Sequence, residues 1–148
     1  MNASPIEPPV FFIDRNSGGR IFRDLLVEQG IKVVLHDDEF PQAAADEDWL
    51  ISVGEKGWIV ITGDNATTSS PLFLLRLAKS KTFVFILLGL NGVSAVEKAD
   101  CILKARKTIL CLIAERHPPA IWRIGKDQTA REFDFQKVLV DMRRRRKA

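Results

Sequence analysis

Short apolar runs alternate along the chain with longer segments in which apolar residues recur every three or four positions. The runs have the length of β-strands and cover residues 10–13, 32–36, 58–62, 82–88 and 120–124. The periodic segments between them are typical of helices with one buried face, and we expect these helices at residues 21–29, 46–56, 71–79 and 94–115. Because strands and helices alternate, the pattern predicts a parallel sheet with helices on both faces.

The predicted fold class is therefore α/β, a three-layer α/β/α domain with a mainly parallel central sheet of four to five strands. Strands that are apolar at nearly every position fit such a doubly covered sheet. We place this domain at residues 10–125, after a flexible N-terminus at residues 1–9. Residues 37–45 are predicted to be a polar loop. Residues 126–148 are predicted to be weakly structured, with a short hairpin and a frayed basic helix.

The composition agrees with one folded domain, and the positive net charge comes from one short segment of the chain. The 148 residues are 46% hydrophobic and 28% charged, as in globular proteins. The formal net charge is +3, but residues 143–147 hold five of the 22 basic residues, which leaves 17 basic against 19 acidic residues elsewhere. The basic character therefore belongs to the tail, and the body gives no general electrostatic argument for binding nucleic acid.

The sequence also predicts a soluble, cytoplasmic protein with no contact to a membrane. The longest apolar run, residues 83–90, is much shorter than the ~20 residues that span a bilayer. The first nine residues lack the basic start and apolar centre of a signal peptide. Cys101 and Cys111 fall in one predicted helix, roughly 15 Å apart along its axis, so neither a disulfide nor a shared metal site is expected.

Acidic residues follow two of the predicted strands and open one of the helices. Asp14 ends the first strand, Asp64 follows the third strand after Gly63, and Asp46 begins the helix between the second and third strands. Ligands of open α/β sheets gather at the carboxyl ends of the strands. Three carboxylates at that edge repel one another unless a cation joins them, and Mg²⁺ or Mn²⁺ prefers such oxygen ligands. Turn formation or helix capping is the alternative role for each of these acids.

Four segments together resemble the PIN-like domain family of the VapC toxin kind. They are residues 11–16, the acids Asp37 and Asp38 after His36, residues 46–50, and residues 59–64 with the Thr-x-Asp order. In that family an Asp ends the first strand, an acid opens the helix before the third strand, and Thr-x-Asp follows the third strand. The resemblance covers residues from about 10 to 120 and maps these positions onto Asp14, Asp46 and the pair Thr62 and Asp64.

The resemblance implies a metal-dependent ribonuclease, commonly the toxin of a toxin–antitoxin pair. Asp14, Asp46 and Asp64 would hold Mg²⁺ or Mn²⁺, and Thr62 would orient Asp64 by hydrogen bonding. The implied partners are an RNA substrate, an antitoxin protein and a second copy in a homodimer. Two alternatives stand beside it: a catalytically weak PIN-like module that binds RNA or protein, and a receiver-type signalling domain. The receiver domain lacks support because Arg15 follows Asp14 where an acidic pair is needed.

One departure from the family concerns the residues after Asp64. Many members have a further acid there, whereas this chain has Asn65 and then Ala-Thr-Thr. Asn65 or Thr67 could hold a water molecule or a substrate oxygen, and Glu47 or Asp48 could replace the missing acid beside Asp46. The number of metal ions, one or two, stays open.

Further candidates surround these acids. Arg15, Asn16, Arg20 and Asn65 are candidates for substrate contact, because arginine and amide groups bind phosphate oxygens. His36 could carry a proton near the metal, although a packed role is more common for a lone histidine.

Overall fold

The computed structural model describes residues 9–41 and 46–147, without the side chains of residues 46–48 and 147. The strands are β1 (Val10–Ile13), β2 (Lys32–Leu35), β3 (Ile59–Thr62), β4 (Phe83–Leu87), β5 (Ala120–Ile124) and β6 (Ala130–Phe133). The helices are α1 (Arg20–Glu28), α2 (His36–Glu39), α3 (Asp46–Glu55), α4 (Pro71–Lys79), α5 (Ala95–Glu115) and α6 (Phe135–Lys147), and two short 3-10 helices are η1 (Arg15–Ser17) and η2 (Asn65–Ser69).

The strands form one sheet in the order β2-β1-β3-β4-β5-β6. Strands β1 to β5 run parallel, and β6 pairs antiparallel with β5. The prediction of a three-layer α/β fold with a mainly parallel sheet is confirmed, with one strand more than expected. The extra strand β6 escapes the pattern because it lies at the sheet edge and exposes Arg131 and Glu132 between half-buried residues.

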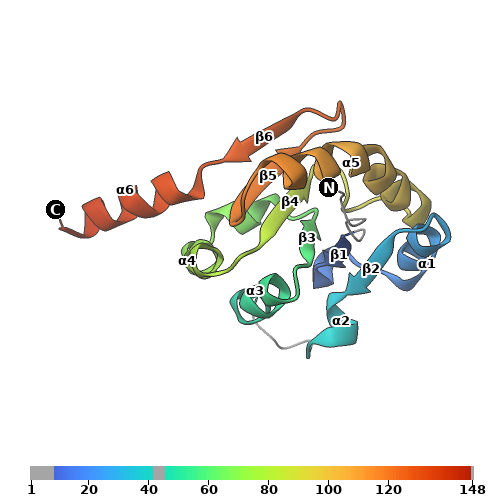
Figure 1. Cartoon of the computed structure of the whole chain (residues 1–148), viewed down its shortest axis with the longest axis horizontal. Coiled ribbons are helices and arrows are strands. Elements are labelled where there is room, and N and C mark those ends of the chain that lie inside the picture. Colours follow the sequence, from blue (N-terminus) through green and yellow to red (C-terminus); the bar gives the residue numbers. More distant parts are fainter. Residues whose placement is uncertain (1–8, 42–45, 148) are drawn as a thin grey trace, which may run out of the picture.

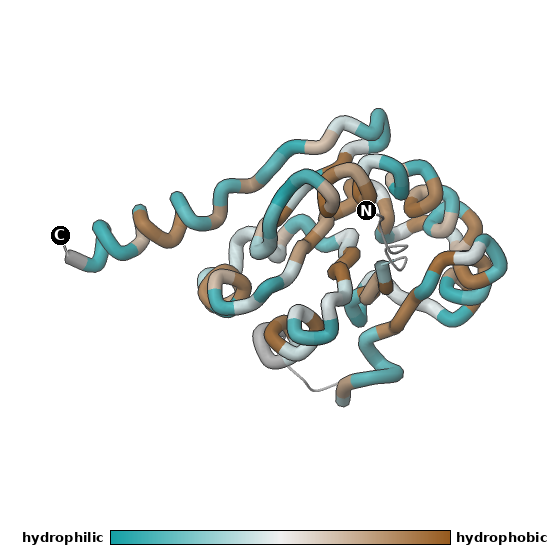
Figure 2. Tube along the Cα trace, viewed as in Figure 1, coloured by the Kyte–Doolittle hydropathy of each residue, from teal (hydrophilic) through white to brown (hydrophobic). Residues whose placement is uncertain are grey.

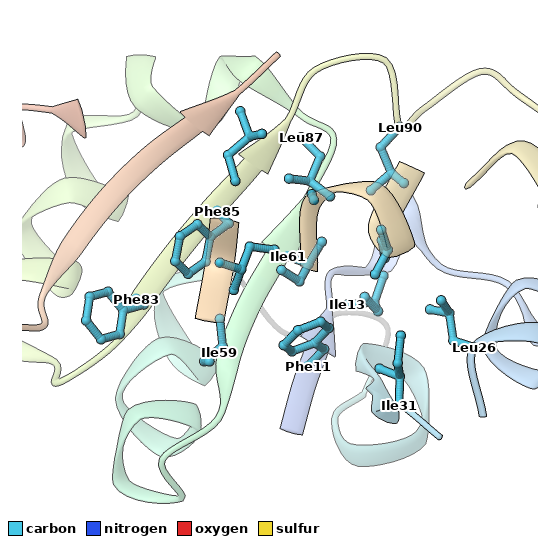
Figure 3. Close-up of a cluster of buried hydrophobic side chains, with 14 of the residues drawn as sticks. Phe11, Ile13, Leu26, Ile31, Ile59, Ile61, Phe83, Phe85, Leu87 and Leu90 are labelled. Carbon is cyan, nitrogen blue, oxygen red and sulfur yellow. The ribbon is translucent and has the colours of Figure 1, made fainter. Parts of the chain in front are cut away.

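Alternate residues of the central strands point to opposite faces of the sheet and build two cores. On one face, Phe11 and Ile13 of β1 lie beside Ile59 and Ile61 of β3 and are covered by α1 and α5 (Figure 3). On the other face, Phe12, Val60 and Val84 are covered by α3 and α4, with Trp49 fully buried among them. The doubly covered sheet explains why the strands read as continuous apolar runs.

The C-terminal segment is more ordered than its sequence suggested. Residues 126–148 were predicted to be weakly structured, but they include β6 and the 13-residue helix α6. Phe135 and Leu139 of α6 are buried in the core beside α4. Val138 and Met142 pack against the same core, and towards its C-terminal end α6 projects from the body (Figure 1) with mostly hydrophilic residues (Figure 2). The apolar anchors were missed because they are few and the arginine run dominates the segment.

The region after β2 also differs from the expectation of a continuous strand and loop. The predicted strand at residues 32–36 ends at Leu35, and His36 starts the short helix α2, in which the Phe40 N–H donates to the His36 carbonyl at 2.9 Å. Part of the predicted loop is therefore helical, while residues 42–45 lie outside the described residues. None of the described helices has both the length and the apolar character needed to cross a membrane.

Candidate functional site

Asp14 and Asp64 follow neighbouring parallel strands at the carboxyl edge of the sheet. Strands β1 and β3 are aligned with Ile13 beside Ile61, and the Asp14 N–H extends this ladder by donating to the Ile61 carbonyl at 3.3 Å. After β1 the chain enters α1 on one face, and after β3 it enters α4 on the other face. The two acids therefore lie where the crossovers diverge, which is the usual ligand position in an open α/β sheet.

Hydrogen bonds around Asp64 fix both its backbone and one carboxylate oxygen. The Asp64 N–H donates to Thr62 Oγ1 at 3.0 Å, and Asp64 Oδ1 accepts a bond of 2.9 Å from the Ala66 N–H at the start of η2. Thr62 was expected to orient Asp64 by hydrogen bonding, and its buried hydroxyl does accept a bond from the Asp64 backbone N–H. The carboxylate is thus pinned through Oδ1, while Oδ2 stays outside the hydrogen bonds of the described residues.

Ser17 and Lys98 connect the turns that carry the two acids. The Gly63 N–H donates to Ser17 Oγ at 2.9 Å, so the turn after β3 is bonded to the turn after β1. Lys98 of α5 donates from Nζ to the Ser17 carbonyl at 3.1 Å, and its Nζ lies 5.7 Å from the centre of the Phe22 ring. Ser17 is fully buried, and through these two part-buried bonds it holds both turns in one arrangement.

Gly63 is required by a close approach between the turns after β3 and β4. A Cβ atom at this position would lie 2.5 Å from Asn91 Oδ1 and 3.0 Å from the Asn91 backbone nitrogen. Real Cβ contacts are essentially never that short, so a side chain here would displace Asn91. The residue between Thr62 and Asp64 is therefore fixed by the packing of a neighbouring strand end.

Arg123 of β5 anchors η2, the segment that begins at Asp64. Its Nε donates to Asn65 Oδ1 at 2.7 Å, and its NH2 group donates to Thr68 Oγ1 at 2.8 Å. The guanidinium also lies over the Phe133 ring, 4.9 Å from its centre. Asn65, a predicted substrate contact, thus uses its Oδ1 to bind Arg123 within the chain.

A hollow of about 360 Å³, the Asp14 hollow, opens beside the first acid. Its lining is Asp14, Arg15, Gly18, Gly19, Arg20, Leu35, His36, Asp37 and Asp38. Arg15 and Arg20 are exposed at the starts of η1 and α1, and Asn16 is exposed between them in sequence. Three of the four predicted substrate contacts therefore lie along the turn that follows Asp14.

The acids and the histidine after β2 have partners within the protein. The His36 ring is buried among Phe12, Phe40 and Trp49, and its Nδ1 lies 3.1 Å from Asp37 Oδ1. Asp38 forms an ion pair with Arg23 at 3.1 Å. These contacts support the packed role for the histidine over proton transfer.

Of the three residues predicted to bind a metal ion, Asp14 and Asp64 have side chains that the structure describes. Asp46 is the first residue of α3, but its side chain, like those of Glu47 and Asp48, is outside the described part. Among the described side chains, no group of three or more His, Cys, Asp and Glu residues could hold a metal ion. Asp14 and Asp64 each supply carboxylate oxygens at the ends of neighbouring strands, and such oxygens are the ligands that a hard divalent cation prefers, so the chemistry of the residues present fits such an ion.

The structure thus adds four residues that sequence reasoning did not single out. Ser17 lies in the polar turn directly after Asp14, a signal that the sequence did contain. Asn91 lies in the turn after β4, Lys98 in α5 and Arg123 in β5, and their sequence neighbours carry no motif. Only the fold brings them to the turns that carry the acids.

Comparisons with known proteins agree with this arrangement. The family model described as "PIN like domain" matches residues 9–89, more than half of the chain, and this segment includes every predicted site residue. No curated protein and no solved structure gives a match.

Proposed function

The chain belongs to the PIN-like domain family, whose members are generally nucleases, and from this we propose that it hydrolyses phosphodiester bonds of RNA with Mg²⁺ or Mn²⁺. The single observation that carries the proposal is the placement of Asp14 and Asp64 at the carboxyl ends of adjacent parallel strands. Two carboxylates in neighbouring positions repel each other, and a divalent cation relieves that repulsion.

Asp14 and Asp64 would hold the ion, with Asp46 as the third ligand from the start of α3. A divalent ion at such a site lowers the pKa of bound water and stabilises negative charge on a phosphodiester. The chain's own residues would keep the ligands in place. Thr62 and Ala66 fix Asp64 from its two sides, and the Ser17 hydroxyl holds the adjoining Gly63 amide.

Arg15 and Arg20 would bind the phosphates of the substrate in the hollow beside Asp14. Both line the Asp14 hollow, and a planar guanidinium binds phosphate oxygens through two parallel hydrogen bonds. Their positive charges would bring the anionic strand towards a carboxylate edge that would otherwise repel it. The substrate role of these two side chains therefore follows from their position beside the acids.

The test is cleavage of a labelled single-stranded RNA by the full chain with and without Mg²⁺ or Mn²⁺. Replacing Asp14→Asn or Asp64→Asn should lower the rate by ~100-fold or more, since even changes to groups that merely support metal ligands cost 10–100-fold. Asp141→Asn on α6 is the matched control, because Asp141 lies outside the site. Undiminished cleavage by both site variants would contradict the proposal.

A catalytically weak RNA-binding module is the second candidate. It is favoured by residues 65–68, which contain no acid where many family members have one a few residues after Thr-x-Asp, and Asn65 and Thr68 are bonded to Arg123. RNA retention by the wild-type chain, without cleavage in either metal, would select this candidate. Cleavage that Asp14→Asn removes would exclude it.

We also propose that the protein acts in the cytoplasm as the toxin of a toxin–antitoxin pair, bound by an antitoxin and able to form a homodimer. The support is the resemblance of its acid pattern to VapC-type toxins. Expression of the chain alone should arrest growth, and expression of Asp14→Asn should not. A small neighbouring reading frame whose product restores growth would identify the antitoxin, and normal growth with the active chain would refute the toxin role.

A further inference from the structure

Two more hollows continue from the Asp14 hollow along the starts of α1 and α5. The next one, the Lys98 hollow, measures about 390 Å³ and shares Gly18, Gly19 and Arg20 with the Asp14 hollow. The one beyond it, the Gln128 hollow, measures about 230 Å³ and shares Val93 with the Lys98 hollow. The three hollows are therefore neighbours, in order from the Asp14 hollow through the Lys98 hollow to the Gln128 hollow at the turn between β5 and β6.

The Lys98 hollow has the chemistry of a phosphate site. Arg20 and Lys98 are its charged residues, and its described lining contains no acid. Ile21, which is 70% exposed, adds an apolar surface at its rim. A polynucleotide that leaves the Asp14 hollow would thus meet two cations at the position of its next phosphate.

The Gln128 hollow has a different character, because its charges balance. Its lining has two lysines, Lys104 and Lys126, and two acids, Glu97 and Asp100. Lys104 forms an ion pair with Asp100 at 2.9 Å. Leu88 and Val93 supply apolar surface between these groups. A balanced rim and an apolar lining favour a neutral planar group with polar edges over a phosphate.

The size of the Gln128 hollow agrees with such a group. Sites for drug-sized ligands enclose roughly 300–1,000 Å³, and this hollow is smaller at about 230 Å³. It therefore suits a single one- or two-ring group, such as a nucleobase.

Gln128 combines a positive φ with a buried side-chain acceptor that has no partner among the described residues. It is the non-glycine residue with a positive φ, +67°, within the described chain, a conformation that glycine would adopt without strain. Its Oε1 is buried and has no hydrogen-bond partner among the described residues, while its Nε2 donates to the Lys126 carbonyl at 3.2 Å. The turn between β5 and β6 accounts for the positive φ, because the Gln128 N–H donates to the Gly125 carbonyl at 3.0 Å and the Gly125 N–H donates to the Thr129 carbonyl at 3.1 Å. The unmet acceptor at the wall of the hollow is the feature that points to a ligand.

We propose that the Gln128 hollow binds a nucleobase of the RNA strand whose neighbouring phosphate lies at Arg20 and Lys98. Gln128 and Lys126 would contact the polar edge of the base, and Leu88 and Val93 its faces. The inference rests on the proposed function for the identity of the strand. It adds a binding site outside the metal-ligand region, and that site can be tested without any cleavage.

The first experiment measures the affinity for a fluorescent RNA pentamer in EDTA, so that cleavage does not enter. Gln128→Gly should lower the affinity about five-fold or more, the loss expected for one base contact. The same change should leave the melting temperature unchanged or raise it, because glycine relieves the strain at this φ. Gln136→Ala on the exposed surface of α6 is the control and should bind like wild type. Wild-type affinity in Gln128→Gly would overturn the proposal, as would a wild-type chain that binds no pentamer.

The second experiment uses the two cysteines of α5 as an internal pair. Cys101 lines the Gln128 hollow, whereas Cys111 is exposed further along the same helix and outside that lining. Saturating pentamer should slow alkylation of Cys101 several-fold and leave the rate at Cys111 unchanged. Equal rates at Cys101 with and without bound pentamer would place the base elsewhere.

Two further ligands show whether the protection of Cys101 comes from a base, from the phosphates or from a free nucleotide. An abasic pentamer has the same phosphates, so protection of Cys101 by it would overturn the assignment of a base to this hollow. Protection by a free mononucleotide but not by the pentamer would overturn the assignment to a strand. If the pentamer protects Cys101 but the protein cuts no RNA in either metal, the binding site stands and the nuclease proposal fails.

Discussion

The Nε atom of Arg123 donates a hydrogen bond of 2.7 Å to Oδ1 of Asn65, which lies 58 positions earlier in the chain. The bond ties η2, the segment that Asp64 opens, to the fifth strand of the sheet. A second bond to Thr68 and the contact with the Phe133 ring strengthen the same attachment. The segment that follows Asp64 is thus held by a strand that carries no acid of its own.

Replacing Arg123→Ala should therefore lower both stability and cleavage. Loss of two charge-assisted hydrogen bonds is expected to cost about 1–3 kcal/mol of unfolding free energy, measured by chemical denaturation. The RNA cleavage rate should fall by more than the loss of folded protein explains, because η2 is no longer bonded to Arg123. Arg144→Ala, an exposed residue of α6, should change neither quantity. Equal cleavage by both variants would show that η2 holds Asp64 without Arg123.

Replacing Gly63→Ala should distort the site by steric contact. The new methyl group would meet the Asn91 side chain and backbone, so the turn after β3 or the turn after β4 must move. We expect destabilisation of about 1–3 kcal/mol, the usual range for overpacking. Reduced cleavage should accompany it, because Asp64 is the next residue. Ser69→Ala in the exposed part of η2 is the control, and normal cleavage by Gly63→Ala would contradict the role of this close approach.

The two free thiols should react at different rates. Burial, and secondarily the charge of Asp100, raises the pKa of Cys101 above its ordinary value of 9.0, so less reactive thiolate is present at pH 8. Cys111 is exposed on the same helix and should be alkylated first. The Cys101 rate should increase as the pH rises through its raised pKa, and denaturant should remove the difference between the thiols. Mass spectrometry of partly alkylated protein measures both sites, and equal rates in the native protein would contradict the burial of Cys101.

Replacing Phe135→Ala should show that the C-terminal helix belongs to the domain. Phe135 is 3% exposed in the core beside α4, and truncation of a buried aromatic side chain costs about 3–5 kcal/mol. The adjacent change Gln136→Ala affects an exposed side chain and should be close to neutral. Thermal melting of both variants provides the measurement. A melting temperature unchanged by Phe135→Ala would mean that α6 contributes nothing to the core.

The local pattern was sufficient for the central elements because each of them buries a regular apolar face. Strand β3 is buried at all four positions, and the helix after it begins at Pro71 as the sequence indicated. The pattern failed where burial is partial. Strand β6 alternates weakly at the sheet edge, and α2 is a single turn of polar residues whose only buried member is His36.

The sequence by itself determined the acids and their strand-end positions, because a buried parallel strand must end where polar residues begin. The tertiary structure decided which groups hold the turns that carry those acids. Asn91, Lys98 and Arg123 contact Gly63, Ser17 and Asn65 across the carboxyl edge of the sheet, and the order of the strands brings them there. These contacts join residues that lie far apart in the chain, so no local spacing encodes them.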